Sequence, residues 1–185
     1  AHKMAGPTGI GCLLVRKDAM EEMGPFMTGG SMIKSVTTQG STFQEGHAMF
    51  ETGTPRIAEA IGWGAAVEWL SQYDMNEVHS HIQEIASWTA EKMKNIDGIT
   101  IYGDPKHSNS SGAVSFLHST IQSQDLALLL DEGGFAVRTG HHCAQPLMDA
   151  LGVPSTNRIS FWIYNTMEEA KSFVEHLEYV VKRFS

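Results

Sequence analysis

The chain has 185 residues, 42% of them hydrophobic, which is enough for one domain or for one domain with part of another. The formal net charge of −8 argues against a broad nucleic-acid-binding surface, because such surfaces are rich in lysine and arginine. Two cysteines, Cys12 and Cys143, are too few for a disulfide framework, and the apolar runs are too short to cross a bilayer. We therefore expect a protein of a reducing compartment that binds neither nucleic acid nor membrane.

The first part of the chain shows little periodicity. The apolar run Ile10–Val15 follows a Gly/Pro-rich turn and predicts a strand. Asp18–Met23 predicts a short helix that is closed by Gly-Pro. Residues 24–53 are rich in Gly, Thr, Ser and Gln, and they are expected to form a long loop. Long ordered loops are often functional.

Two helices are predicted next. The first covers roughly residues 55–72, with Thr54 as the N-cap and Pro55 in the first helical position. The second covers Asn76–Lys94. Its apolar residues recur at helical spacing and predict a core-facing side made of Ile82, Ile85, Ala86, Trp88 and Met93.

The remainder alternates between the two element types. The expected strands are Thr100–Tyr102, Ala113–Leu117, Phe135–Arg138 and Arg158–Ile163, and the expected helices are Ser123–Glu132, Pro146–Leu151 and Met167–Phe184. Ser123 and Thr166 are the expected N-caps. The alternation predicts a small α/β domain over residues 74–185, with residues 1–73 as the tail of a larger preceding domain.

The segment from Arg138 to Pro146 is the strongest candidate for chemistry. It places Cys143 after a predicted strand and before a short helix, and it includes His141 and His142. A nearby arginine, two histidines and a helix start all favour the nucleophilic thiolate. An inert packing cysteine is the alternative. A zinc site is not expected, because adjacent residues rarely point at one ion and the sequence shows no second ligand cluster.

Three other residues have both a functional and an ordinary interpretation. Lys3 can form a Schiff base with a carbonyl cofactor, or it can be a solvent-exposed lysine. Arg158 begins an apolar strand and needs an anionic partner, which is either a substrate carboxylate or an internal salt bridge. Thr54 can hold a phosphate at a helix start, or it can only cap that helix.

The order of these motifs resembles the group II cysteine desulfurases and their relatives, the selenocysteine lyases, within the class-V aminotransferase-like enzymes of pyridoxal-phosphate (PLP) fold type I. The resemblance covers essentially the whole chain and rests on Gly6–Gly11, Gly29–Ile33, Phe50–Pro55, Arg138–Met148 and Tyr164–Thr166. Arg138–Ala144 is its most specific part. The chain corresponds to roughly the last half of such an enzyme.

The resemblance implies roles for seven residues. Lys3 is the Schiff-base lysine, His2 contacts the cofactor phosphate, and Thr54 reaches the phosphate of the neighbouring subunit in a homodimer. Cys143 is the nucleophile that becomes a persulfide. Arg158 grips the substrate carboxylate, and Arg138 and His141 line the site. Met49 and Arg56 depart from residues common in the family, which puts details of the subunit contact near Thr54 in doubt.

The implied activity converts L-cysteine to L-alanine and leaves a persulfide for a sulfur-acceptor protein of iron–sulfur cluster assembly. The resemblance implies a cytoplasmic or plastid protein whose N-terminal half is missing here, and it implies that this chain alone is inactive. Three alternatives stay open: a selenocysteine lyase, a cofactor-free sulfur carrier and a purely structural fragment.

Overall fold

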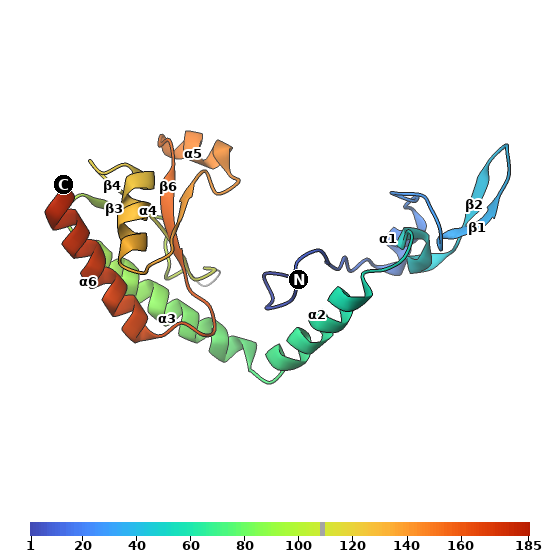
Figure 1. Ribbon diagram of the computed structural model, residues 1–185, viewed down its shortest axis with the longest axis horizontal. Helices are drawn as coiled ribbons and strands as arrows, with labels where there is room; N and C mark the ends of the chain where they lie inside the picture. Colours follow the sequence, from blue (N-terminus) through green and yellow to red (C-terminus); the bar gives the residue numbers. More distant parts are fainter. Residues whose placement is uncertain (108–109) are drawn as a thin grey trace. The chain divides into compact units, whose positions relative to one another are not determined.

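The computed structural model describes residues 1–107 and 110–185 (Figure 1). The chain divides into two compact units, Ala1–Tyr73 (unit 1) and Asp74–Ser185 (unit 2). None of the helices in the described part has the length and hydropathy needed to span a bilayer. The fold is mixed α/β, as predicted.

Unit 1 is built from short elements. They are helix α1 (Lys17–Glu21), strands β1 (Ile33–Val36) and β2 (Ser41–Phe43), the 3₁₀ helix η1 (Gly46–Phe50) and helix α2 (Ile57–Leu70). β1 and β2 pair as an antiparallel hairpin, so the prediction of a loop over residues 24–53 is wrong there. Most hairpin side chains are exposed, and without a buried face the sequence carries no alternation that marks a strand.

The prediction of a strand over residues 10–15 is also wrong. The segment has no regular structure, and Leu13 and Leu14 are 79% and 92% exposed. An apolar run becomes a strand only beside a partner strand, and no described strand pairs with this segment.

Helix α2 begins later than predicted. Arg56 is its N-cap residue and makes no side-chain cap, so the prediction of Thr54 as the cap and Pro55 as the first helical residue is wrong. The backbone of Arg56, with φ −73° and ψ 75°, is not yet helical. Thr54 therefore lies in the loop before the helix, where its hydroxyl group is not committed to capping.

Unit 2 contains one four-stranded sheet. Its strands are β3 (Ile99–Tyr102), β4 (Ala113–His118), β5 (Arg138–Gly140) and β6 (Thr156–Ser160), in the order β3-β4-β6-β5. All neighbours pair antiparallel. β5 begins three residues later than predicted and β6 two residues earlier. The predicted positions followed the apolar runs, and these mark burial rather than strand pairing.

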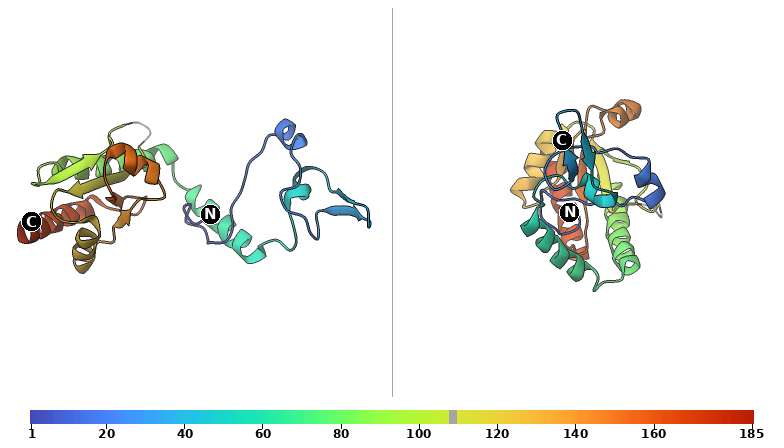
Figure 2. Two further views of the ribbon diagram at one scale, coloured as in Figure 1. Left: turned by 90° about the horizontal axis from the view of Figure 1, so that it is seen from above. Right: turned by 90° about the vertical axis from the view of Figure 1, so that its right-hand side faces the viewer.

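Helices cover one face of this sheet. α3 (Met75–Met93) and α6 (Met167–Phe184) run side by side, and α4 (Ser123–Glu132) packs on α6, β5 and β6 (Figure 2). The core between helices and sheet includes fully buried Phe116, Phe173 and Leu177. The predicted face of α3 is buried as expected, with Trp88 partly buried against the same core.

Of the two N-caps predicted in unit 2, one is confirmed and one is wrong. Thr166 accepts from the backbone N–H of Glu169, and the Glu169 carboxylate accepts from the backbone N–H of Thr166, so the capping box of α6 confirms the prediction. Ser123 is not the cap of α4. Gln122 holds that position, and the Ser123 hydroxyl pairs with that of Ser155 at 2.5 Å.

Candidate active site

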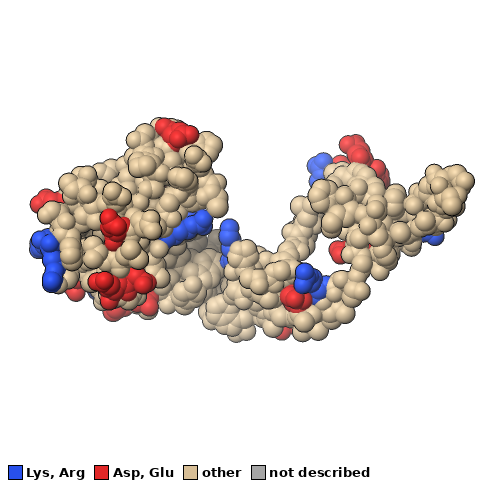
Figure 3. Space-filling view, turned by 45° about the horizontal axis from the view of Figure 1, so that its top comes forward, with Lys and Arg blue, Asp and Glu red and all other residues tan. Residues whose placement is uncertain are grey.

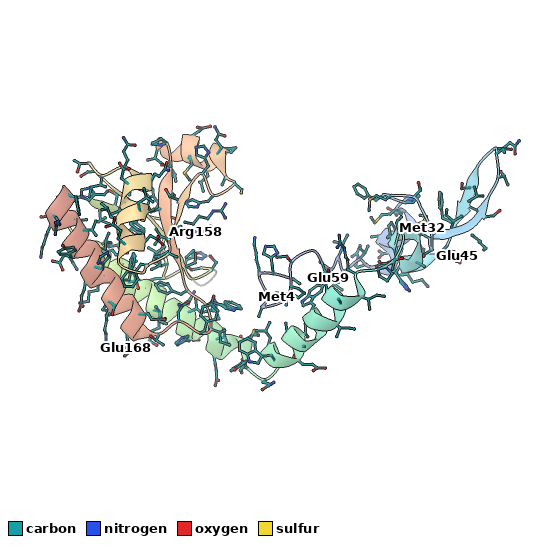
Figure 4. The ribbon with its side chains drawn as sticks, viewed as in Figure 1. Met4, Met32, Glu45, Glu59, Arg158 and Glu168 are labelled. Atoms are coloured by element: carbon teal, nitrogen blue, oxygen red, sulfur yellow. The ribbon has the colours of Figure 1, made fainter. Side chains whose placement is uncertain are left out.

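In unit 2, a row of polar side chains crosses the face of the sheet that α3, α4 and α6 leave uncovered. Residues directly opposite each other in a ladder share a face, and Ser115 on β4 lies opposite both Tyr102 on β3 and Arg158 on β6. Arg158 in turn lies opposite Arg138 on β5. Two guanidinium groups are thus placed on neighbouring strands of the same face (Arg158 is labelled in Figure 4).

This arginine pair lacks a counter-charge. Like charges directly opposite in a sheet are destabilising, and neither arginine forms a salt bridge with a carboxylate among the described residues. The Nε atom of Arg158 is buried and has no hydrogen-bond partner in the described part of the chain. The internal salt bridge considered for Arg158 is therefore absent from the described residues, and the pair is suited to an added anion.

The cysteine lies on a tight turn at the end of β5. The backbone N–H of Ala144 donates to the carbonyl oxygen of His141 at 2.9 Å and closes the turn. Its two central residues, His142 and Cys143, have φ angles of 56° and 62°. Both are left-handed, as in a type I′ turn, a conformation that costs about 1–2 kcal/mol for each non-glycine residue. The turn projects Cys143 outward, immediately before α5 (Gln145–Leu151).

The thiol is exposed and has a cationic donor. Nη2 of Arg138 lies 3.3 Å from Sγ of Cys143, close enough to donate a hydrogen bond to sulfur. The exposure of Cys143 is contrary to the alternative of an inert packing cysteine. Geometry thus combines a reachable nucleophile with a group that stabilises negative charge on it.

His142 links the turn to the sheet. Its Nε2 lies 2.9 Å from both the carbonyl oxygen and the Oγ1 of Thr156, a fully buried residue at the start of β6. Burial lowers the pKa of His142. The charges of Arg158, Arg138 and His141 lower this pKa further, against a raising effect of the bond to the Thr156 carbonyl. The imidazole is therefore neutral near pH 7, with its proton on Nε2 facing the carbonyl oxygen.

His141, which the family resemblance singled out, is exposed and makes no side-chain hydrogen bond among the described residues. The sequence alone offers no signal that separates it from His142, since the two are adjacent and chemically identical. Only the backbone conformation of the turn decides which imidazole reaches Thr156.

A cavity of about 400 Å³ lies beside this turn. Apolar residues of α5, Leu147, Met148 and Leu151, form one wall. The sheet residues Tyr102 and Arg158 form another, and His142 also lines the space. Arg158 thus faces a hollow with room for a small molecule.

The predicted cofactor residues are all in unit 1. His2 and Lys3 are exposed on a turn in which the Ala1 carbonyl accepts from the N–H groups of Met4 and Gly6 (Met4 is labelled in Figure 4). The turn packs on α2, where a Cβ on Gly6 would lie 2.9 Å from the Trp63 side chain. Lys3 forms no ion pair among the described residues, so its amine is available for covalent chemistry.

Thr54 lies apart from that turn. It is exposed and lines a cavity of about 840 Å³ whose walls come from residues 9–11, 27, 31, 47–56 and 60. His2 and Lys3 do not line this cavity, so unit 1 does not bring the three predicted cofactor residues into one cradle.

Charged side chains outside this site form no large single-sign patch on the face that Figure 3 shows. Lysine and arginine are scattered among acidic side chains on the face shown in Figure 3. Within residues 1–107 and 110–185, no group of three or more His, Cys, Asp or Glu side chains is placed to hold a metal ion.

Known proteins resemble this chain throughout its length. The family model "Aminotransferase class-V" matches residues 1–173. A cysteine desulfurase of Haloferax volcanii is 43% identical over 177 residues, covering 96% of this chain and 41% of that protein. A probable cysteine desulfurase of Staphylococcus epidermidis is also 43% identical, covering 100% of this chain and 44% of that protein.

Solved structures give the same result. The cysteine desulfurase CsdA of Escherichia coli, with an S-sulfonic acid, superimposes with a TM-score of 0.94 at 34% identity, over 100% of this chain and 45% of that one. An apo cysteine desulfurase of Thermococcus onnurineus gives 0.92 at 33% identity, over 98% of this chain and 45% of that one. The chain therefore spans less than half the length of the relatives it matches.

Proposed function

The chain belongs to the class-V aminotransferase family, and on that premise we propose that it is the C-terminal part of a PLP-dependent cysteine desulfurase. Residues 1–73 are then the end of the large cofactor-binding domain, and residues 74–185 are the small domain that carries the nucleophile. The observation that carries the proposal is the exposed thiol of Cys143, which lies 3.3 Å from the guanidinium of Arg138, a residue directly opposite Arg158 in the sheet.

Members of this family are PLP enzymes, and the residues of unit 1 fit that cofactor. The Lys3 amine is exposed and free of ion pairs among the described residues, as Schiff-base formation requires. His2 and Thr54 offer an imidazole and a hydroxyl group for the phosphate. The family resemblance implies that Thr54 reaches the phosphate of the neighbouring subunit in a homodimer, and its position in a cavity that Lys3 does not line is compatible with that role. When bound, PLP supplies the electron sink for the reaction.

Arg158 holds the substrate carboxylate. A carboxylate that accepts from this guanidinium supplies the missing counter-charge of the Arg138–Arg158 pair. This hydrogen bond to the carboxylate also gives the buried Nε atom of Arg158, or the other nitrogens of its guanidinium, an acceptor. Substrate binding therefore relieves a repulsion that the free protein maintains, and the cavity beside Arg158 has space for a molecule the size of cysteine.

Cys143 then performs the sulfur transfer. Its thiolate attacks the substrate sulfur, a sulfur–sulfur bond forms, and the bond between that sulfur and the substrate Cβ breaks. The electron pair of the broken bond remains with the substrate, and a proton delivered by the Lys3 amine completes L-alanine. Arg138 donates to Sγ and stabilises the negative charge before the attack. Thiol and L-cysteine become persulfide and L-alanine, with no outside oxidant.

The persulfide is passed to an acceptor protein of iron–sulfur cluster assembly. Cys143 is exposed at the tip of a four-residue turn that is tied to β5 and β6. A turn this short cannot carry sulfur over a distance, so the acceptor must approach the cysteine.

The test supplies the chain with PLP, L-cysteine and the N-terminal half of a relative such as the Staphylococcus epidermidis protein. We expect the peptide containing Cys143 to gain one sulfur atom by mass spectrometry, with an equal amount of L-alanine formed. Cys143→Ser abolishes both products. The matched control, Cys12→Ser, changes the other exposed cysteine and leaves both products unchanged.

The chain without that half is expected to show neither product. L-alanine formation that survives Cys143→Ser refutes the assigned role of this thiol. Turnover of selenocysteine in the absence of any turnover of cysteine makes the protein a selenocysteine lyase instead.

A further inference from the structure

The turn that carries Cys143 does not hold its shape by backbone preference. Four non-glycine residues of the described chain have positive φ, namely Ala5, Ser31, His142 and Cys143, and the last two are consecutive. Each disfavours this conformation because the Cβ atom approaches the neighbouring carbonyl oxygen. Other contacts must therefore hold the turn in this conformation.

The backbone supplies one such contact. The N–H of Ala144 donates to the His141 carbonyl oxygen within the turn itself. A bond between two ends of the turn shapes the turn but does not fix its direction relative to the sheet. Fixing the direction of the Cys143 side chain requires a contact from the turn to another element.

The imidazole of His142 makes that contact. Its Nε2 lies 2.9 Å from two atoms of Thr156, which is 0% exposed and pairs with Gly140 at the end of β5. The anchor point is thus part of the sheet ladder and immediately beside the start of the turn. Among the described residues, no other side chain of the turn forms a hydrogen bond to β6.

The chemistry of the position suits a neutral donor. Burial lowers the pKa of His142, and the positive charges of Arg158 on β6 and Arg138 on β5 lower it further. A lysine here would add a further cation to the arginine pair. A carboxylate would face the Thr156 carbonyl oxygen with no hydrogen to donate.

We propose that His142 is a positioning residue, which ties the turn to Thr156 and thereby holds the sulfur of Cys143 against the guanidinium of Arg138. The proposal rests on the proposed role of Cys143 as sulfur acceptor. It adds a second requirement for reactivity, since the cationic donor acts on sulfur only while the turn keeps its direction.

The test uses the 185-residue chain without cofactor or substrate, so its result does not depend on the desulfurase assay. Cys143 is alkylated with neutral iodoacetamide or with anionic iodoacetate, and each rate is read from the modified peptide by mass spectrometry. The ratio of iodoacetate rate to iodoacetamide rate reports the positive charge beside the sulfur. Cys12, exposed in unit 1, is the internal reference in every sample.

Two variants form a matched pair. His142→Gln places an amide N–H near the position of Nε2, whereas His142→Asn tolerates the left-handed backbone but is one methylene shorter. We expect the ratio at Cys143 to fall about threefold or more in His142→Asn, the scale of one lost hydrogen bond between neutral groups, and to be largely retained in His142→Gln. The ratio at Cys12 stays constant.

Arg138→Gln shows that the assay responds, because it removes the charge itself and lowers the ratio at Cys143. Circular dichroism confirms that each variant is folded, and if His142→Asn unfolds, Thr156→Val removes the Oγ1 contact instead and is expected to give a smaller fall. Equal ratios in wild type, His142→Asn and Thr156→Val, with a fall in Arg138→Gln, overturn the proposal. An equal fall of the rate ratio at Cys143 in His142→Gln and in His142→Asn also overturns the proposal.

Discussion

Unit 1 and unit 2 differ in how much apolar surface their described residues bury. The hydrophobic core cluster is made entirely of unit 2 residues, with Phe116, Phe173 and Leu177 fully buried. In unit 1, Met32 is buried, whereas Leu14 and Phe26 are 92% and 91% exposed. The unit that carries Cys143 is therefore organised by its own side-chain packing, while unit 1 is shaped mainly by turns and local hydrogen bonds.

The helices of the two units show the same contrast. α6 has one apolar stripe that enters the core, as an amphipathic helix does. Apart from Glu59 and Glu68, α2 consists of apolar residues and glycine that are not confined to one side, yet only Ala66 and Leu70 are buried, and Ile61 is 71% exposed. A helix whose apolar residues extend beyond one stripe is typical of a protein interior, so the composition of α2 suits more burial than the described residues provide.

The largest expected effect is a difference in stability between substituting a buried phenylalanine of unit 2 and an exposed one of unit 1. Phe173 makes edge-to-face contacts with Phe116 and Phe135 in the core, so Phe173→Ala is expected to lower the free energy of unfolding by about 3–5 kcal/mol. Phe26→Ala, in unit 1, is the control and is expected to change it by less than about 0.5 kcal/mol. Urea denaturation followed by circular dichroism measures both. Similar losses in the two variants contradict the contrast.

A smaller difference in stability is expected between substitutions at the start of α6 and before the start of α2. Thr166→Ala removes the capping-box hydroxyl of α6 and is expected to cost about 1 kcal/mol in the urea experiment. Thr54 precedes α2, which has no side-chain cap. Thr54→Ala is therefore expected to lower the free energy of unfolding by less than about 0.3 kcal/mol. A loss at Thr54 that equals the loss at Thr166 shows that Thr54 caps α2 after all.

The smallest expected effect is the pH dependence that His142 of unit 2 gives to the free energy of unfolding. Because burial holds the pKa of folded His142 below its unfolded value of about 6.5, protons bind the unfolded chain more tightly. The contribution of this residue to stability is complete above about pH 6.5 and declines as the pH falls through that value. Unfolding free energies measured between pH 7.5 and 5 are expected to decline less steeply in His142→Gln than in wild type. Parallel pH curves would show that this histidine is not responsible.

The candidate site was predictable from the sequence in its residue types but not in its contacts. The segment from Arg138 to Cys143 indicated a nucleophile with a cationic neighbour, and the structure places Nη2 beside Sγ. The partner of Arg138 across the ladder was not foreseen, because strand register depends on β6, which lies some twenty residues later in the sequence. The role of Thr156 likewise depends on that register.

Local chemistry determined much of the fold. The limits of α6, its capping box and the buried face of α3 follow from periodicity and cap residues that act within one or two turns of a helix. The β5 and β6 limits, the irregular segment at residues 10–15 and the β1–β2 hairpin did not follow. Strands depend on partners distant in sequence, so an apolar run alone predicts burial without predicting pairing.

By itself, the sequence determined which reactive groups this protein offers for the proposed chemistry: a thiol, two arginines and a lysine, together with the helices that frame them. Tertiary structure alone decided that Arg138 and Arg158 stand side by side without a counter-charge, and that His142 rather than His141 reaches the sheet. The physical reason is that charge and hydrogen-bonding capacity belong to each residue, whereas distance and direction are set by strand register and by a turn whose conformation its own residues disfavour.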